Sequence, residues 1–313
     1  MSEEPTHPDP MTAARTRPAG SVAAALVAAL RPRQWVKNLL VLAALVPAGK
    51  NVVTGEYIVD AAAVGRVAVA FAVFCVASSG IYLIADTVGA SSDRANSARR
   101  YRPIAAGLVP APVACVLGAV LLAAAVLVSL AVSWQLAFVT AMFIAMQLSY
   151  WLALTEVAVI DICLVAGGFL VRAIAGGVAA EVRLSMWFLL VTASGSVFVA
   201  AGKRYAELMI ARDTGARMRA SLQYYTPTYL RFVWTMAATA LVVFYSLWAF
   251  EPARSDSIWF ELSLIPFTMA VLRYAVSIDG AEADEPEEIA LHSARLQLLA
   301  LVWIVALLIA VYH

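Results

Sequence analysis

Residues 63–94 read AVGRVAVAFAVFCVASSGIYLIADTVGASSDR, and this stretch decides the class of fold. Up to position 85 it holds one charged side chain, Arg66. A helix of about 20 apolar residues is long enough to cross a bilayer. Two carboxylates, Asp86 and Asp93, stand where the apolar run ends. The stretch therefore predicts a transmembrane helix with acidic side chains at one end.

The whole chain shares this apolar character. Of its 313 residues, 63% are hydrophobic and 14% are charged, whereas soluble domains are roughly one-quarter charged. These values predict an all-α, polytopic membrane protein, and the apolar runs predict a bundle of nine transmembrane helices. The predicted spans are 34–50, 63–87, 109–131, 133–152, 157–180, 185–203, 227–250, 258–277 and 293–312.

The distribution of basic side chains predicts the orientation. Most of the 22 lysines and arginines lie in the N-terminal arm up to residue 37, in segment 88–108 or in segment 203–226, all on one side of a nine-span bundle. Cytoplasmic loops hold an excess of basic residues. We therefore expect this side in the cytoplasm and the protein in the plasma membrane. Residues 1–20 predict a disordered cytoplasmic tail, and residues 21–313 a single transmembrane helical domain.

The composition also excludes several kinds of chemistry. The three cysteines lie inside apolar runs without the spacing of a redox or metal motif, and the three histidines lie outside the predicted spans. Catalysis with histidine as the base, histidine-bound zinc and haem sites are therefore not expected. A nucleic-acid partner is not expected either. The chemistry must rely on carboxylates, arginines, lysines and hydroxyls.

The first candidate site is the carboxylate pair Asp86 and Asp93. Their seven-residue spacing is close to two helical turns, so both share one face if the helix continues. Two such carboxylates suit Mg²⁺, which binds through few protein ligands together with substrate phosphates. The alternative is an acidic helix cap with a salt bridge to Arg94 or Arg100.

The adjacent segment 99–102 holds three arginines in four positions. Guanidinium groups grip phosphate oxygens in bidentate fashion, so this composition favours a phosphate clamp, although a cytoplasmic loop gives the same composition. Segment 31–38 adds further cations and donors on the same side. The candidates for phosphate binding in these two segments are Lys37, Asn38, Arg94, Arg100 and Arg102.

Two charged residues fall within the predicted span 157–180. Asp161 and Arg172 are eleven residues apart, so they face the same way but lie too far apart along the helix to pair. Because buried charges in a membrane are costly, each needs a partner from another helix or from a ligand. The glycines at positions 167, 168, 176 and 177 favour close helix packing.

The end of span 185–203 offers a further polar group, Lys203, Arg204 and Tyr205. It either holds a second phosphate or is engaged by a salt bridge from Lys203 to Glu207. All these groups together predict a cytoplasm-facing polar cavity that suits a diphosphate with Mg²⁺ and opens to a long apolar chain in the membrane lipid. A transporter is disfavoured because the outer halves of the spans hold almost no charge.

Seven segments carry a resemblance to a known family. They are RPRQWVKN (31–38), DR and RRYRPIAAG within 93–107, the stretch 161–177 ending in LVRAIAGG, AGKRYAEL (201–208), YLRFVW (229–234), IPFTMAVLRYAV (265–276) and LQLLALVWI (296–304). On these segments the chain resembles the UbiA-type superfamily of intramembrane prenyltransferases, and within it the decaprenyl-phosphate phosphoribosyltransferase branch. The resemblance covers nearly the whole chain from residue 31.

The resemblance implies a nine-helix UbiA-like fold and a magnesium-dependent membrane enzyme. The implied reaction transfers 5-phosphoribose from phosphoribosyl pyrophosphate to decaprenyl phosphate, for the synthesis of cell-wall arabinan. It implies catalytic roles for Asp86, Asp93 and Asp161, with Mg²⁺ on the first two. The pocket positions that match the family are Arg172, Lys203, Arg204 and Tyr205.

The chain departs from the family pattern at three positions. In the motif N-D-x-x-D-x-x-x-D, Asp86 and Asp93 match the outer carboxylates, but Ala85 replaces the asparagine and Gly89 the middle aspartate. Thr155 stands where a lysine is expected. The absent carboxylate at position 89 counts against aromatic prenyl transfer, the second hypothesis. The three departures together motivate a third, a non-catalytic paralogue that binds polyprenyl phosphate. A homo-oligomer remains open.

Overall fold

The part of the chain that the computed structural model describes is built from helices and turns, without a strand, which confirms the all-α prediction. It comprises residues 22–45, 60–95, 100–215, 220–250, 258–283 and 286–312. The predicted tail 1–20 lies outside these ranges. The helices are α1 (Val22–Ala29), the 3₁₀ helix η1 (Pro32–Leu39), α2 (Leu40–Ala43), α3 (Ala61–Val88), α4 (Ala90–Ala95), α5 (Ala111–Val132), α6 (Trp134–Ser149), the π-helical turn η2 (Tyr150–Leu154), α7 (Ile160–Ala180), α8 (Met186–Thr214), α9 (Ala220–Gln223), α10 (Pro227–Ala249), α11 (Ile258–Asp279), α12 (Pro286–His292) and α13 (Ala294–Tyr312).

Seven helices in the described ranges are long and apolar enough to cross a membrane. They are α3, α5, α6 extended by η2, α7, α8, α10 and α11, and they coincide with the second to eighth predicted spans. The predicted ninth span appears as a shorter apolar helix, 294–310. The described part of the predicted first span consists of η1 and α2, which are short. The total of nine spans therefore stays a prediction.

Side-chain caps determine where several of the long helices begin. Asp60, Ser133, Ser185 and Thr226 each precede a helix and accept a hydrogen bond from the backbone N–H three residues further on. This bond satisfies one of the N–H groups that the first helical turn leaves without a partner. The polar residues between the apolar runs therefore mark helix starts.

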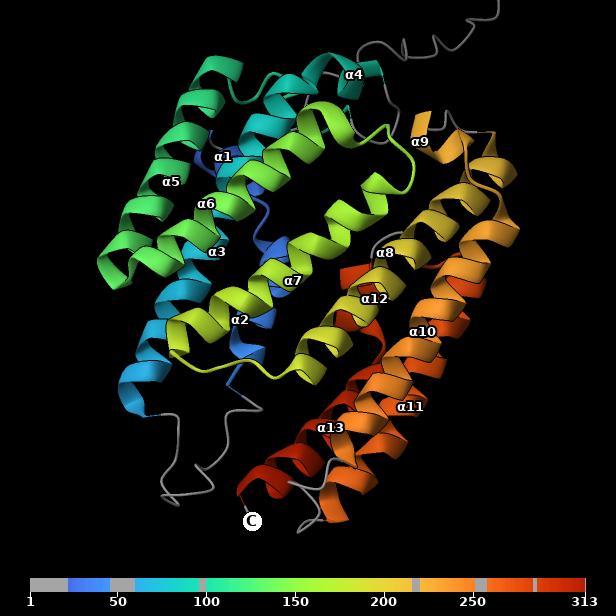
Figure 1. Ribbon diagram of the computed structural model, residues 1–313. Helices are drawn as coiled ribbons and strands as arrows, with labels where there is room; N and C mark the ends of the chain where they lie inside the picture. Colours follow the sequence, from blue (N-terminus) through green and yellow to red (C-terminus); the bar gives the residue numbers. More distant parts are fainter. Residues whose placement is uncertain are drawn as a thin grey trace, which may run out of the picture.

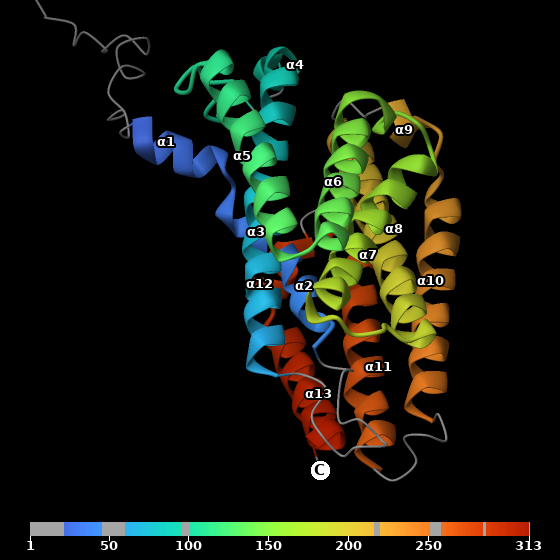
Figure 2. The same cartoon turned by 60° about the vertical axis from the view of Figure 1, so that its left-hand side comes forward.

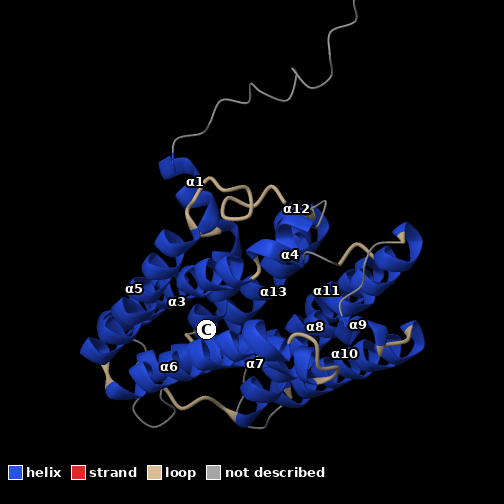
Figure 3. Cartoon of the chain, turned by 90° about the horizontal axis from the view of Figure 1, so that it is seen from above, coloured by secondary structure: helices blue, strands red, loops and turns tan. Residues whose placement is uncertain are grey.

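Helix α7 contacts both halves of the bundle. It packs against α2, α3 and α6 on one side and against α8 on the other (Figure 1). Figures 1 and 2 show α4 and α9 at one end of the bundle and the C-terminal end of α13 at the opposite end. Viewed from above, α1 lies at the periphery (Figure 3). The segment after α3 and the segment after α8 therefore share one end, as the charge distribution predicts.

Glycines allow the closest helix contacts, as predicted for the α7 glycines. A Cβ atom at Gly176 would lie 1.9 Å from the carbonyl oxygen of Val41, so α2 reaches α7 only because this side chain is absent. At Gly177 a Cβ would meet the side chain of Leu184 at 2.6 Å. The Gly176 contact holds α2, which directly follows η1, against the C-terminal part of α7, about one turn beyond Arg172.

Candidate active site

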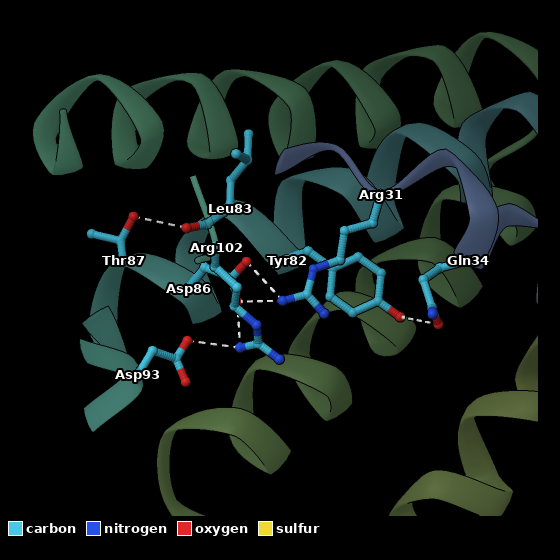
Figure 4. Close-up of polar contacts among 8 residues, drawn as sticks. All are labelled: Arg31, Gln34, Tyr82, Leu83, Asp86, Thr87, Asp93 and Arg102. Atoms are coloured by element: carbon cyan, nitrogen blue, oxygen red, sulfur yellow. Dashed lines mark hydrogen bonds and ion pairs between the residues drawn. The ribbon is translucent and has the colours of Figure 1, made fainter. Parts of the chain in front are cut away.

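Asp86 and Asp93 are both buried and share one guanidinium group. The Nη1 atom of Arg102 donates to Asp86 Oδ1 at 3.2 Å and to Asp93 Oδ2 at 2.7 Å. Nη2 of Arg31 donates to both oxygens of Asp86, at 2.6 and 2.8 Å. Figure 4 shows the four side chains converging. The structure thus brings the two predicted carboxylates together and adds Arg31, from 55 residues away, as a direct partner.

A short break between α3 and α4 keeps the two carboxylates on one face. Helix α3 ends at Val88, and Gly89 follows with right-handed helical dihedrals, φ −80° and ψ 0°. The amide of Asp93 donates to the Gly89 carbonyl at 2.9 Å, which is a helical hydrogen bond across the break. Because the break retains this geometry, the two-turn spacing of the sequence survives in the structure.

Arg31 reaches Asp86 from a left-handed turn between α1 and η1. Its φ of 52° and ψ of 60° cost a non-glycine residue roughly 1–3 kcal/mol. Ser79 anchors this turn to α3, because its hydroxyl accepts from Trp35 Nε1 at 3.1 Å and donates to the Leu30 carbonyl at 2.9 Å. The Arg31 guanidinium also lies 4.9 Å from the ring centre of Tyr82. These contacts fix the position of the guanidinium.

From the carboxylates, η1 continues into the bundle with polar side chains. Gln34 Oε1 accepts from Lys37 Nζ at 2.5 Å and from the Tyr82 hydroxyl at 3.5 Å. Tyr82 and Asp86 are four residues apart on α3 and therefore lie on the same face. The side chains of Arg31, Gln34, Lys37 and Tyr82 therefore form a polar strip that starts at the carboxylate pair. The predicted cation Lys37 belongs to this strip.

Asn38 and Arg172 form the deepest part of this strip. Arg172 Nε donates to Asn38 Oδ1 and Nη1 donates to the carbonyl of Gly168, both at 2.7 Å. The guanidinium carbon lies 4.6 Å from the ring centre of Phe143 and 5.7 Å from that of Phe169. The partner that Arg172 takes from another element is therefore an amide. No carboxylate in the described part of the chain lies within 4 Å of it.

A second carboxylate and guanidinium cluster lies between α7 and α8. Arg204 Nε donates to Asp161 Oδ2 at 2.6 Å. The other two nitrogens of Arg204 donate to Glu207 Oε2 and to the hydroxyl of Tyr150, both at 2.8 Å. Of the two partners that the sequence left open for Asp161, a group on another helix or a ligand, the structure shows the first. This pairing also shows that Arg204 does not project into the polar strip as a separate cation.

Tyr225 ties this second cluster to the loop before α7. Its hydroxyl donates to Asp161 Oδ1 and accepts from the Val159 amide, both at 2.5 Å. Val159 has φ 69° and ψ −48°, an outlying conformation for a β-branched residue. Burial and the hydrogen bond to Asp161 raise the pKa of the Tyr225 hydroxyl, which keeps it a neutral donor. Sequence reasoning missed Tyr225 and Tyr150; the outlying backbone and the π-helical turn are visible only in the structure.

The other predicted residues of α8 make contacts with neighbouring residues of α8 and α10. Lys203 Nζ is 4.0 Å from Glu207 Oε1, the i,i+4 pair that the sequence offered as the alternative. The hydroxyl of Tyr205 accepts from Arg231 of α10 at 2.8 Å, so this side chain faces α10.

Arg94 and Arg100 are exposed at the same end of the bundle. Arg100 Nη2 donates to the hydroxyl of Tyr101 at 2.7 Å. The salt bridges to the carboxylate pair in the described ranges come from Arg31 and Arg102. Of the predicted loop arginines, the structure places Arg102 at the site.

An apolar cavity of about 490 Å³ lies beside the deep end of the polar strip. Leu40 and Phe169 line it next to Asn38 and Arg172. Further lining residues come from four more helices: Phe188, Val191, Leu241, Trp248, Phe267, Val271, Leu296 and Trp303. The volume falls within the roughly 300–1,000 Å³ of ordinary ligand pockets. A polar cavity that faces the cytoplasm stays a prediction.

The carboxylate oxygens of Asp86 and Asp93 are ligands that suit Mg²⁺. In the ranges described, no three His, Cys, Asp or Glu side chains gather as a metal site. Magnesium, however, often takes only one or two carboxylates and completes its shell with substrate phosphates and water. One positively charged nitrogen, Nη1 of Arg102, already bridges Asp86 and Asp93. The two carboxylates are therefore close enough to share a single cation.

Comparison with known proteins identifies the class. Residues 40–299 match the UbiA prenyltransferase family, and the chain belongs to this family. It is 52% identical to a decaprenyl-phosphate phosphoribosyltransferase of Mycolicibacterium smegmatis, over 94% of this chain and 95% of that protein. It is 46% identical to the protein of that name from Corynebacterium glutamicum, over 95% of this chain and 90% of the other. Among solved structures, a UbiA homologue from Archaeoglobus fulgidus bound to DMAPP and Mg²⁺ has a TM-score of 0.68 at 11% identity, covering 91% of this chain and 98% of that one. This last likeness shows the fold.

Proposed function

We propose that this protein transfers 5-phosphoribose from phosphoribosyl pyrophosphate to decaprenyl phosphate and releases pyrophosphate. One observation carries the proposal: a cluster of paired carboxylates and guanidiniums is joined through η1 to an apolar cavity. Such a site suits a water-soluble polyanion at one end and a lipid at the other. The activity named for the relatives from M. smegmatis and C. glutamicum supports the same reaction.

Arg31 and Arg102 are the residues placed to hold the diphosphate of the donor. Both guanidiniums are partly exposed, whereas the carboxylates that they contact are buried. Guanidinium groups bind phosphate oxygens strongly and in bidentate geometry. In this arrangement they stabilise the negative charge that develops on the departing pyrophosphate.

Asp86 and Asp93 would hold Mg²⁺ in this proposal. When bound, the ion supplies positive charge to the leaving pyrophosphate. The shared approach of both carboxylates to Arg102 Nη1 supports this assignment, as does the Mg²⁺ found in the A. fulgidus homologue. The two aspartates then act by placing charge beside the leaving group.

The acceptor needs no general base, which agrees with the groups present. A phosphate monoester has a second pKa of about 6 and is largely ionised at pH 7. One of its oxygens forms the bond to the anomeric carbon while the bond from that carbon to pyrophosphate breaks. The protein contributes by holding the two substrates in line, a positioning effect.

We further propose that the protein resides in the plasma membrane with the carboxylate pair facing the cytoplasm. Seven membrane-length helices support the multi-pass arrangement. The end that carries α4 and α9 also carries the exposed arginines Arg94, Arg100 and Arg212, as expected of a cytoplasmic side.

A radiochemical assay tests the reaction. Purified protein in detergent, given labelled phosphoribosyl pyrophosphate, Mg²⁺ and decaprenyl phosphate, is expected to form a labelled lipid. Asp86→Asn should reduce product formation about 10²- to 10³-fold. Arg66→Gln should retain it, because Arg66 bonds the Ala179 carbonyl away from the site. Prenylation of an aromatic acceptor instead would support the second hypothesis. Lipid-phosphate binding without any turnover would support the non-catalytic paralogue.

A further inference from the structure

Arg172 presents a positive charge in the middle of the bundle that no carboxylate of the described chain balances. Its side chain is 5% exposed. Two of its N–H groups have protein acceptors, Asn38 Oδ1 and the Gly168 carbonyl, and both acceptors are neutral. No partner for Nη2 lies in the parts of the chain that the structure describes. A buried, uncompensated arginine is expensive in a membrane protein, which makes Arg172 a candidate for binding an anion.

The surroundings of Arg172 specify an amphipathic anion. Phe169, one helical turn before it, lines the apolar cavity and lies 5.7 Å from the guanidinium. Leu40, which follows Asn38 by two residues, lines the same cavity. The charge therefore stands at the border between the polar strip and the apolar cavity. A ligand with an anionic head and a hydrocarbon chain satisfies both environments at once.

The border between the polar strip and the apolar cavity lies deeper in the bundle than the carboxylate pair. Asn38 Oδ1 lies 3.5 Å from the hydroxyl of Ser78, which is eight residues before Asp86 on α3. At 1.5 Å per residue, the two levels differ by about 12 Å along the helix. This leaves room for the diphosphate of the donor at the carboxylates and for the reacting carbon in between.

We infer that Arg172 and Asn38 form the acceptor subsite, where Arg172 binds the phosphate of a polyprenyl monophosphate whose chain enters the apolar cavity. This inference rests on the proposed function, because it divides that site into a donor part at Asp86 and Asp93 and an acceptor part at Arg172. Arg172 sets the position of the attacking oxygen, and Asn38 orients the guanidinium through its Oδ1 atom.

Direct binding measurements test the subsite without requiring turnover. The probes are farnesyl phosphate, farnesol and phosphoribosyl pyrophosphate with Mg²⁺, each measured by equilibrium binding to purified protein in micelles. Arg172→Gln is expected to weaken farnesyl phosphate binding about 10- to 100-fold, the range for a hydrogen bond to a charged group. Farnesol and phosphoribosyl pyrophosphate should bind within about 2-fold of wild type. Arg172→Lys should recover part of the loss, and Arg66→Gln should change none of the three affinities.

Asn38→Asp provides a variant of nearly the same shape. The new carboxylate still accepts from Arg172 Nε but cancels the positive charge, so farnesyl phosphate binding should fall selectively while the fold is retained. This variant decides the matter if Arg172→Gln fails to fold. If the variants weaken phosphoribosyl pyrophosphate binding as much as farnesyl phosphate binding, Arg172 binds the donor instead of the acceptor. This result would overturn the inference. Unchanged farnesyl phosphate binding in both variants would also overturn it. If selective loss occurs but wild type makes no labelled lipid, the subsite stands and the proposed reaction falls.

Discussion

The two carboxylate and guanidinium clusters use the same side chains but differ in their exposure. At the first, Arg31 and Arg102 are 21% and 28% exposed and contact buried carboxylates. At the second, Arg204 and Asp161 are 2% and 0% exposed. A guanidinium that reaches the surface can exchange a carboxylate for a substrate phosphate. The pair of Arg204 and Asp161 cannot, because neither side chain reaches the surface.

This difference in exposure indicates different roles for the three aspartates that the family resemblance implies are catalytic. Asp86 and Asp93 lie where a metal and a diphosphate can reach them. Each oxygen of Asp161 accepts from protein donors, among them Arg204 and Tyr225. We therefore propose that Asp161 is a positioning residue, which holds the start of α7 against α8 and leaves contact with substrate to the other two.

The largest expected effect is on stability, at the second cluster. We call this the sealed cluster, because its Arg204 and Asp161 are shielded from solvent. Asp161→Asn should lower the free energy of unfolding by about 3 kcal/mol, because Arg204 then keeps only the partly exposed Glu207 as a charged partner. Denaturant unfolding in micelles measures this change. The matched control is Asp279→Asn, which breaks the exposed pair with Arg231 and should leave unfolding unchanged. An Asp161→Asn variant as stable as wild type would contradict the assignment.

At the first cluster, the open cluster of Asp86, Asp93, Arg31 and Arg102, a substitution should mainly reduce activity. Asp86→Asn is expected to reduce kcat about 10²- to 10³-fold, the range for loss of one preorganised electrostatic group at a reacting centre. Its unfolding should change far less than that of Asp161→Asn, because Arg31 and Arg102 remain partly solvated. Product formation and unfolding are measured on the same preparation. A loss of stability equal to that of Asp161→Asn would erase the distinction between the clusters.

A smaller effect is expected from the guanidinium that bridges the pair. Arg102→Gln should raise the KM for phosphoribosyl pyrophosphate about 10- to 100-fold, as expected for loss of a charge-assisted hydrogen bond to phosphate. Steady-state kinetics with varied donor measure it. Arg100→Gln should have a lesser effect, because Arg100 is exposed and bonds to Tyr101. The reverse order would place the clamp on Arg100, as the sequence alone also allowed.

The smallest effect should come from the hydroxyl at the edge of the sealed cluster. Tyr225→Phe removes a donor to Asp161 and an acceptor for Val159, and should destabilise the protein by about 1–2 kcal/mol. Thermal unfolding in micelles measures this loss. Because the hydroxyl touches neither Asp86 nor Asp93, the KM for the donor should stay within about 2-fold. A large rise in this KM would link the loop before α7 to the donor site.

Local patterns were enough to predict part of the site. The seven-residue spacing placed Asp86 and Asp93 on one face, because the chain stays nearly helical across Gly89. The cost of buried charge predicted that Asp161 and Arg172 need partners from elsewhere. It could not say which partners, and they proved to be Arg204 for Asp161 and Asn38 for Arg172.

The sequence by itself determined the membrane class, seven of the helical spans, the shared end of the charged segments and the carboxylate pair. These follow from composition and from the helical repeat, which act over a few turns of chain. Only the tertiary structure decided which partner each cation meets. Arg31 and Asp86 are 55 residues apart, and Arg172 and Asn38 are 134 apart. Such contacts depend on how the helices pack, for which a glycine such as Gly176 permits an approach that no local pattern encodes.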